Sequence, residues 1–189
     1  MRASYVGEIN SGEGDVELLA GDCLHHLLNV ARVKEGQSLK LLDGQGKTAL
    51  GVIKSISKKS IEVKIEKVEN FERDAQAISI AFAQPKKDAL EFCLRSGVET
   101  GAREIYLLQS ERSQNYRPNL SRYQKILETA LEQSNNPYMP KLSISSLQEL
   151  KFSDYDYCAL ASLRANTEGL RPKGEGLLLI GPEGGFTED

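Results

Sequence analysis

The sequence LLLIGPEGGFTED, residues 177–189 of this 189-residue chain, is the stretch that decides its fold. It is an apolar strand that runs directly into a glycine-rich loop. Small residues let the backbone approach a ligand closely, and ligands in open α/β sheets bind beyond the carboxyl ends of strands. The alternative interpretation is a tight turn between a strand and a helix, and the stretch by itself leaves both open.

The last three residues have the pattern of a helix beginning. Thr187 is a candidate N-cap, and Glu188 and Asp189 are of the type favoured in a first helical turn. A domain seldom ends at such a point. We therefore expect the chain to be truncated, with the rest of its second domain downstream.

Residues 74–180 alternate between strand and helix patterns. We expect buried strands at 78–83, 104–108, 157–161 and 177–180. Two helices are expected between them from apolar residues at helical spacing, with Asn119 or Ser121 as the cap of the second. These helical faces carry Leu90, Cys93, Leu94 and Gly97, and Tyr123, Ile126, Leu127, Ala130 and Ser134. Alternating strands and helices predict parallel βαβ units, and hence an α/β fold.

The preceding part of the chain has a β pattern. Short strands are expected at 38–42, 49–56 and 61–66, and the turn signal Asp43-Gly44-Gln45-Gly46 separates the first two. Several short strands with regular turns favour a small barrel. Residues 70–76 are polar and form a candidate linker. We therefore divide the chain into a β domain at 1–72 and an α/β domain at 74–189.

Two short patterns resemble known sites but lack their full spacing. Gly46-Lys47-Thr48 has the ending of a phosphate-binding loop, but Leu41 stands where that motif needs glycine and no helix follows, which predicts a hairpin turn. Cys23, His25 and His26 lie close together but lack a second ligand pair, so we predict no metal site. One histidine is expected to face the core and the other to be polar or exposed.

Composition limits the classes of protein to which the chain can belong. Lys and Arg number 24 against 27 Asp and Glu, and this net charge of −3 argues weakly against a nucleic-acid binder. No run of 18 apolar residues is present, and the N-terminus lacks the apolar region of a secretory signal. Three widely spaced cysteines favour a reducing compartment. We therefore expect a cytoplasmic location and no membrane span.

Charged residues follow two of the expected strands in the second domain. Ser110-Glu111-Arg112-Ser113 comes after the strand at 104–108, and Lys86 and Lys87 come after the strand at 78–83. Both clusters lie at strand carboxyl ends, where ligands bind, and together they would form a basic rim for phosphate contacts. A solvated surface is the alternative interpretation.

Together these motifs resemble one family over nearly the whole chain. Its members share the Gly181–Thr187 motif, the Ser-Glu-Arg-Ser cluster and a helix with Glu132-Gln133-Ser134. The chain is similar to the ribosomal RNA small-subunit methyltransferase E family of the SPOUT superfamily. The first half agrees, because His25-His26-Leu27 followed by Arg32 and the Asp43–Gly46 turn looks like the family's PUA-like barrel.

The resemblance implies a fold, a reaction and a set of site residues. The fold would be a PUA-like β-barrel that binds RNA, followed by a SPOUT α/β domain with a C-terminal trefoil knot, incomplete in this chain. The reaction would be S-adenosylmethionine-dependent methylation of uridine N3 in 16S ribosomal RNA, by a homodimer. By resemblance, Leu179, Gly181, Glu183, Gly184 and Gly185 line the donor site. The RNA-binding residues would be Arg2, Arg32, Lys86 and Arg112, with Arg112 also catalytic.

The chain departs from the family pattern in three places. Asn135 and Asn136 stand after Glu-Gln-Ser, where members usually carry Arg, and the helix before Gly101 lacks the usual Lys. The third departure is the absent tail. These departures support a second hypothesis, a non-catalytic RNA-binding module that has lost the complete donor site. Donor binding distinguishes the methyltransferase from this module. A nucleotide-binding regulatory domain is a third hypothesis, which predicts nucleotide binding without RNA.

Overall fold

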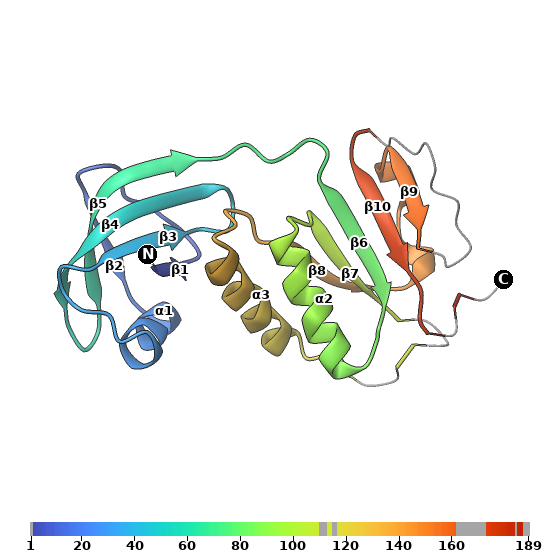
Figure 1. Ribbon diagram of the computed structural model, residues 1–189, viewed down its shortest axis with the longest axis horizontal. Helices are drawn as coiled ribbons and strands as arrows, with labels where there is room; N and C mark the ends of the chain where they lie inside the picture. The colour runs from blue at the N-terminus through green and yellow to red at the C-terminus, as the bar shows by residue number, and fades with distance from the viewer. Residues whose placement is uncertain (1, 110–112, 115–116, 162–172, 184, 187–189) are drawn as a thin grey trace. The chain divides into compact units, whose positions relative to one another are not determined.

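The computed structural model describes residues 2–109, 113–114, 117–161, 173–183 and 185–186 (Figure 1). It divides the chain into two compact units, which are described separately below. The first unit is Met1–Glu72 with Leu131–Tyr138, and the second is Arg73–Ala130 with Met139–Asp189.

The first unit is built on a curled sheet with the strand order β1-β3-β4-β5-β2. β1 pairs with β3 in parallel, and the other neighbouring pairs are antiparallel. Two register shifts interrupt the β4–β5 pair, and such bulges bend a strand and increase its twist. The strands are β1 (Arg2–Tyr5), β2 (Val16–Leu19), β3 (Ser38–Leu42), β4 (Lys47–Ile56) and β5 (Ile61–Asn70).

The core of this unit lies between the curled sheet and a short helical segment, α1 (Asp22–His25) continued by η1 (His26–Val30) (Figure 1). β5 shows how the sequence builds it, because Ile61, Val63 and Ile65 are buried while Glu62 between them is exposed. This is the period-two pattern of a half-buried strand. Burying each of these side chains contributes roughly 2 kcal/mol.

The turn between β3 and β4 is stabilised by its own aspartate. Asp43 Oδ1 accepts hydrogen bonds from the backbone N–H of Gln45 at 2.7 Å and of Lys47 at 3.0 Å. Gly46 has a φ of +108°, which favours glycine. The Gly-Lys-Thr triplet therefore leaves this turn and enters a strand, and the prediction of a hairpin is confirmed.

The segment after α3 belongs to the first unit. Tyr138 donates from its hydroxyl to the carbonyl of Phe71 at 2.5 Å, and the Gly46 N–H donates to the carbonyl of Pro137 at 3.0 Å. These contacts attach residues 131–138 to the hairpin turn and to the end of β5, so the unit is larger than the expected 1–72.

The expectation that one of the paired histidines faces the core is wrong. His25 and His26 are both exposed. Leu24 and Leu27, which flank them, take the inward positions of α1 and η1 and are buried in the core. The spacing of the apolar residues sets which face of the segment points inward, and neither histidine lies on it.

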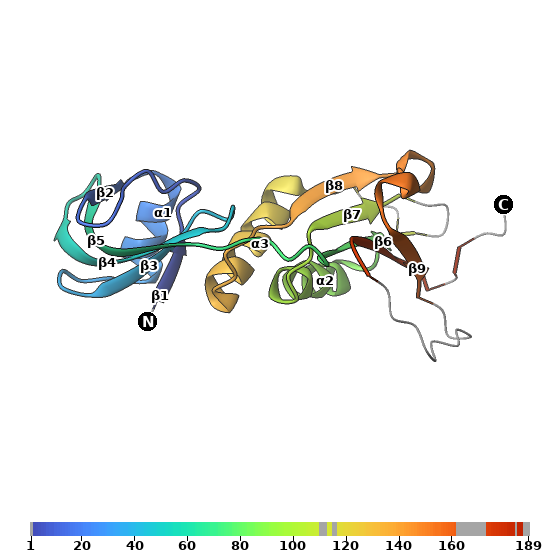
Figure 2. The ribbon, with the colours of Figure 1, turned by 90° about the horizontal axis from the view of Figure 1, so that it is seen from above.

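The second unit contains a sheet with the order β8-β7-β6-β10-β9, in which each neighbouring pair is parallel. Its strands are β6 (Ile78–Ala83), β7 (Glu104–Leu108), β8 (Lys141–Ser145), β9 (Tyr157–Leu160) and β10 (Gly176–Ile180). Figure 2 shows β6 and β7 beside α2 from a second direction. The predicted α/β class is confirmed, while the trefoil knot stays a prediction.

Helices α2 (Lys87–Glu99) and α3 (Leu120–Ser134) follow β6 and β7, as the βαβ pattern predicts. Asn119 caps α3, because its Oδ1 accepts from the backbone N–H of Arg122 at 3.0 Å. Arg122 also forms an ion pair with Glu91, which joins the two helices. Two short 3₁₀ turns, η2 (Leu147–Glu149) and η3 (Phe152–Asp154), lead from β8 to β9.

Candidate functional site

The order of strands in the second unit marks one place for a ligand. The chain begins at β6 and adds β7 and then β8 on one side, then crosses to β9 at the far edge and returns with β10 beside β6. The direction of winding therefore reverses between β6 and β10. Open α/β sheets bind ligands beyond the carboxyl ends of the strands at such a switch point.

Two of the predicted site residues meet at this point. Lys86, in the loop after β6, places its Nζ 3.7 Å from Oε1 of Glu183, in the loop after β10. Both side chains are exposed, at 69% and 86%, so the ion pair contributes little to stability. Its value is geometric, because it brings a predicted RNA-binding cation next to the predicted donor loop.

Gln84 organises the same end of the sheet. It follows β6, is 2% exposed, and donates from its backbone N–H to the carbonyl of Leu108 at 2.9 Å. Its own carbonyl accepts from the N–H of Gln114 at 2.9 Å, and its side-chain amide donates to the Gln114 carbonyl at 2.7 Å. The segment after β7 therefore returns to the end of β6.

Arg112, the predicted catalytic residue, lies outside the described residues. Gln84 was missed by the sequence analysis. The signal for Gln84 in the sequence is an amide side chain directly after the apolar residues of β6. At that position the sequence pattern does not distinguish an exposed side chain from a buried one.

The glycine-rich loop after β10 is folded back on itself. The Gly185 N–H donates to the carbonyl of Pro182 at 2.8 Å, and Gly185 has a φ of +72°. A Cβ on Gly181 would lie 3.2 Å from ring carbons of Phe186, so the aromatic ring needs a small residue beneath it. Gly184 lies outside the described residues. The loop thus needs glycine at Gly185 for its backbone conformation and at Gly181 for space.

Leu179 supports this loop from inside the sheet. Its side chain is 8% exposed and belongs to an apolar cluster with Ala81, Leu108 and Leu177, against which Phe186 packs. Its carbonyl accepts from the N–H of Ala161, after β9, at 2.8 Å. The ends of β9 and β10 are therefore held together under the glycine-rich loop.

A tyrosine pair on this face of the sheet is unsuited to act as a base. Tyr155 donates to the hydroxyl of Tyr106 at 3.0 Å, and Tyr106 donates to Glu104 at 2.7 Å. Burial, and then these two hydrogen bonds, raise the pKa of Tyr106 well above its ordinary value. The phenol therefore stays protonated, and it belongs to the middle residue of β7 rather than to the loops at the strand ends.

A cavity of about 640 Å³ lies on the other face of the sheet. Its lining is mainly apolar and comes from α2, β6 and β10, including Phe92, Ile80 and Ile180. Burial raises the pKa of the Cys93 thiol in this lining, which keeps the thiol neutral. The cavity is separate from the loops at the strand ends.

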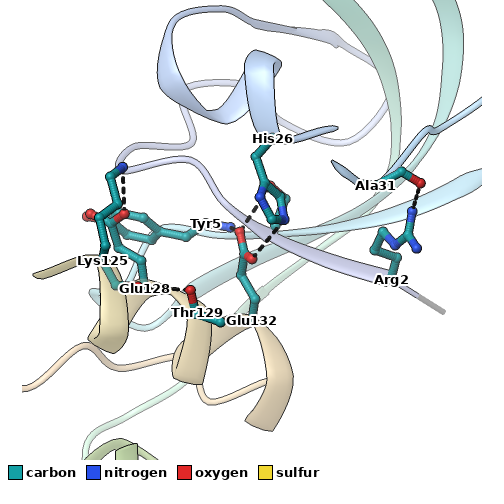
Figure 3. A network of polar contacts seen from close by, with 9 residues as sticks. Arg2, Tyr5, His26, Ala31, Lys125, Glu128, Thr129 and Glu132 are labelled. Carbon is teal, nitrogen blue, oxygen red and sulfur yellow. Dashed lines mark hydrogen bonds and ion pairs between the residues drawn. The ribbon is translucent and has the colours of Figure 1, made fainter. Parts of the chain in front are cut away.

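The first unit brings together the other two predicted RNA-binding residues. The guanidinium of Arg2, on β1, donates to the carbonyl of Ala31, directly before Arg32 (Figure 3). Arg32 has a φ of +48°, a conformation uncommon for a residue with a side chain. Strain of this kind persists where the surrounding structure enforces it and clusters at functional sites. Both arginines therefore lie beside the end of η1.

Comparison with known families agrees with this architecture. Residues 72–189 match the family model for an RNA methyltransferase domain, and residues 19–66 match the RNA methyltransferase PUA domain. The chain belongs to the RNA methyltransferase family. The predicted resemblance to ribosomal RNA small-subunit methyltransferase E is confirmed by the relatives described next.

Curated and solved relatives match most of the chain. Ribosomal RNA small subunit methyltransferase E of Bacillus subtilis is 30% identical over 90% of this chain and 75% of its own length. The Neisseria gonorrhoeae enzyme of that name, solved with S-adenosylmethionine bound, has a TM-score of 0.86 and 29% identity, covering 100% of this chain and 82% of its own. A Legionella pneumophila protein solved with the same cofactor has a TM-score of 0.83, at 25% identity over 98% of this chain and 81% of its own.

The described residues hold neither a metal centre nor a membrane-spanning helix. They contain no group of three or more His, Cys, Asp or Glu side chains placed to hold a metal ion. Within the same part of the chain, no helix is both long and apolar enough to cross a membrane.

Proposed function

We propose that this chain methylates N3 of a uridine in 16S ribosomal RNA, with S-adenosylmethionine as the methyl donor. The coarser part of this function, RNA methylation with that cofactor, follows from the family and from its donor-bound relatives. The main support for the site is the ion pair between Lys86 and Glu183, which lies at the switch point of a parallel sheet.

The donor site in this proposal is the loop after β10, with Leu179, Gly181, Glu183, Gly184 and Gly185. Glycines leave backbone N–H and C=O groups accessible, and these groups suit the neutral polar edges of an adenosine moiety. S-adenosylmethionine, when bound, supplies an electrophilic methyl group on its sulfonium. The protein's task at this loop is to hold the donor in one orientation.

The acceptor presents the greater difficulty. Uridine N3 carries a proton and is a poor nucleophile until that proton leaves. The protein must expose the base, align N3 with the bond to the methyl group, and stabilise the negative charge that develops on the pyrimidine. Exposing the base costs a few kcal/mol. In this proposal Arg112 supplies the positive charge beside the base.

The RNA backbone is held by the other cations. Lys86 lies beside the donor loop, and Arg2 and Arg32 lie together on the first unit. Contacts to phosphate fix the register and orientation of a nucleic acid without reading its sequence. The proposal assigns these three side chains to that task, in a homodimer in the cytoplasm.

Calorimetric titration of S-adenosylmethionine into the chain, followed by methyl transfer to 16S ribosomal RNA, tests the proposal. We expect saturable binding at one site per chain, and 3-methyluridine on mass analysis of the digested RNA. A different methylated nucleoside would overturn the N3 assignment. RNA binding without donor binding would instead support the non-catalytic module that the departures at Asn135 and Asn136 favour.

A further inference from the structure

Glu132, in the last turn of α3, has a well-fixed carboxylate within the first unit. Its Oε1 accepts from the backbone N–H of Tyr5 at 2.9 Å and from the hydroxyl of Ser4 at 3.4 Å, both on β1. The side chain is 18% exposed. Two donors on one strand therefore hold this carboxylate in a single position.

His26, the first residue of η1, faces this carboxylate. Its Nε2 lies 3.7 Å from Oε2 of Glu132, close enough for an ion pair when the imidazole is protonated (Figure 3). The side chain is nevertheless 46% exposed. One ring nitrogen is thus directed at a fixed anion, while about half of the ring surface stays open to solvent.

This arrangement has the form of an oriented histidine. A carboxylate that faces one imidazole nitrogen fixes the direction in which the rest of the ring points. Here the carboxylate is itself held by the backbone of β1, so the orientation of the ring is set by the sheet. An imidazole that served only to link η1 to α3 would have no need of so much exposed surface.

The residues near His26 indicate which kind of ligand the exposed part of its ring can bind. Arg2, on the same strand as Tyr5, donates to the carbonyl of Ala31, and Arg32 follows in its strained conformation. Val30, at the end of η1, is 67% exposed. The Ala31 N–H donates to the carbonyl of His26 at 2.9 Å, so the Arg2 contact lies one turn of η1 from the imidazole.

We propose that His26 binds a phosphate of the RNA substrate and that Glu132 is its positioning residue. This inference rests on the proposed function, because it takes RNA as the partner. Phosphate is the favoured group, since an imidazolium that faces Glu132 with one nitrogen can donate from its other nitrogen to an anion, one turn of η1 from the Arg2 contact. Glu132 does not touch the RNA; it acts through the orientation of the His26 ring.

The first experiment replaces each histidine in turn by glutamine and measures steady-state methyl transfer to RNA. His26→Gln is expected to raise KM for RNA about tenfold, the loss of one hydrogen bond to a charged group, with kcat unchanged. The slope of RNA affinity against salt should fall by about one phosphate contact. His25→Gln, at the exposed neighbouring position, is the matched control and should leave both quantities unchanged.

A double-mutant cycle tests the positioning role of Glu132. Glu132→Gln keeps the size of the side chain and an acceptor for the Tyr5 N–H, but removes the charge. Alone it should raise KM for RNA several-fold; in the His26→Gln background it should add nothing. A merely structural carboxylate would give the same loss in both backgrounds and would also lower the melting temperature.

The outcomes separate this inference from the function on which it rests. If the unaltered chain methylates RNA but His26→Gln leaves KM and the salt slope unchanged, the phosphate contact is wrong and the proposed function stands. Equal losses in His25→Gln and His26→Gln would overturn the role of Glu132. Failure of the unaltered chain to bind RNA would overturn both proposals.

Discussion

The two sheets of this molecule present their functional residues in opposite ways. The mixed sheet of the first unit curls around α1 and η1, and its candidate residues, Arg2 and Arg32, reach outward as side chains from the surface. The parallel sheet of the second unit presents loops at one end, where the backbone of a glycine-rich segment is the candidate ligand site. Side chains suit an extended anion, and backbone groups suit one small ligand.

The largest effect expected from a single substitution tests whether the two units work separately. Gly51 lies at a bulge of β4, where an added Cβ would come within 2.5 Å of the Lys64 carbonyl oxygen. Gly51→Val should lower the free energy of unfolding by about 3 kcal/mol, because the backbone must move. Urea denaturation measures this loss, and calorimetry should show S-adenosylmethionine binding unchanged.

The control for that substitution is Lys54→Val on the same strand, at an exposed position, which should change stability little. Loss of donor binding in Gly51→Val, under conditions where the chain remains folded, would mean that the parallel sheet depends on the curled one. The two units would then not work separately.

The second effect separates chemistry from donor binding within the second unit. Arg112→Ala should slow methyl transfer by about 10²-fold, the usual cost of removing one group that stabilises developing charge. The dissociation constant for S-adenosylmethionine should not change. Arg117→Ala, at an exposed arginine that follows Arg112 closely in the sequence, serves as the control. Equal loss of transfer and donor binding, or loss of neither, contradicts the role of Arg112.

The third effect tests whether the proposed donor loop must keep its backbone conformation at Gly185 in order to bind the donor. Gly185 has a φ of +72°, and among the described residues no atom lies within 4 Å of an added Cβ, so Gly185→Ala introduces strain without a clash with them. The expected cost of about 1 kcal/mol weakens donor binding five- to tenfold if the loop must hold this conformation to bind. Calorimetry measures this change directly.

Gly14→Ala in the first unit is the matched control, because Gly14 has a φ of +88° and equally open surroundings. It should cost similar stability while leaving donor affinity unchanged. If both variants bind the donor as tightly as the unaltered chain, the loop is a turn and not a ligand site.

The smallest effect concerns Lys86, the predicted RNA-binding cation beside the proposed donor loop. Lys86→Ala should weaken RNA binding a few-fold and lower the salt slope by about one, as expected for a single phosphate contact. Its exposed pair with Glu183 contributes little, so the melting temperature should stay the same. Lys87→Ala is the comparison variant. Weaker donor binding with unchanged RNA affinity would place Lys86 in the donor site instead.

The sequence predicted the elements whose patterns are local. β6 and β7 were predicted at their observed bounds, because continuous apolar runs between polar segments identify buried strands. β1 and β8 were missed, since RASY and KLSIS have neither a continuous apolar run nor a fully buried face. Their strand conformation depends on pairing with β3 and β7, which is tertiary information.

The candidate site was predictable in part for a similar reason. The glycine-rich loop and Lys86 were found because both follow strands, and the carboxyl ends of parallel strands share one edge. The buried amide of Gln84 was not found, and Glu132 was noted only as part of the motif Glu132-Gln133-Ser134, with no role assigned to its carboxylate. Both act on segments distant in sequence, and nothing in their immediate neighbours marks them.

The position of β10 has a consequence for how the protein is made. β10 inserts between β6 and β9, so from the end of β9 at Leu160 until β10 has been synthesised at Gly176–Ile180, both strands lack their shared partner. Open strand edges invite wrong pairing, and contacts between residues far apart in sequence form slowly. The strand that closes the gap also carries the glycine-rich loop. The nascent chain therefore acquires the proposed donor loop in the same step that completes its sheet, and the proposed function predicts that a molecule without β10 in place does not bind the donor.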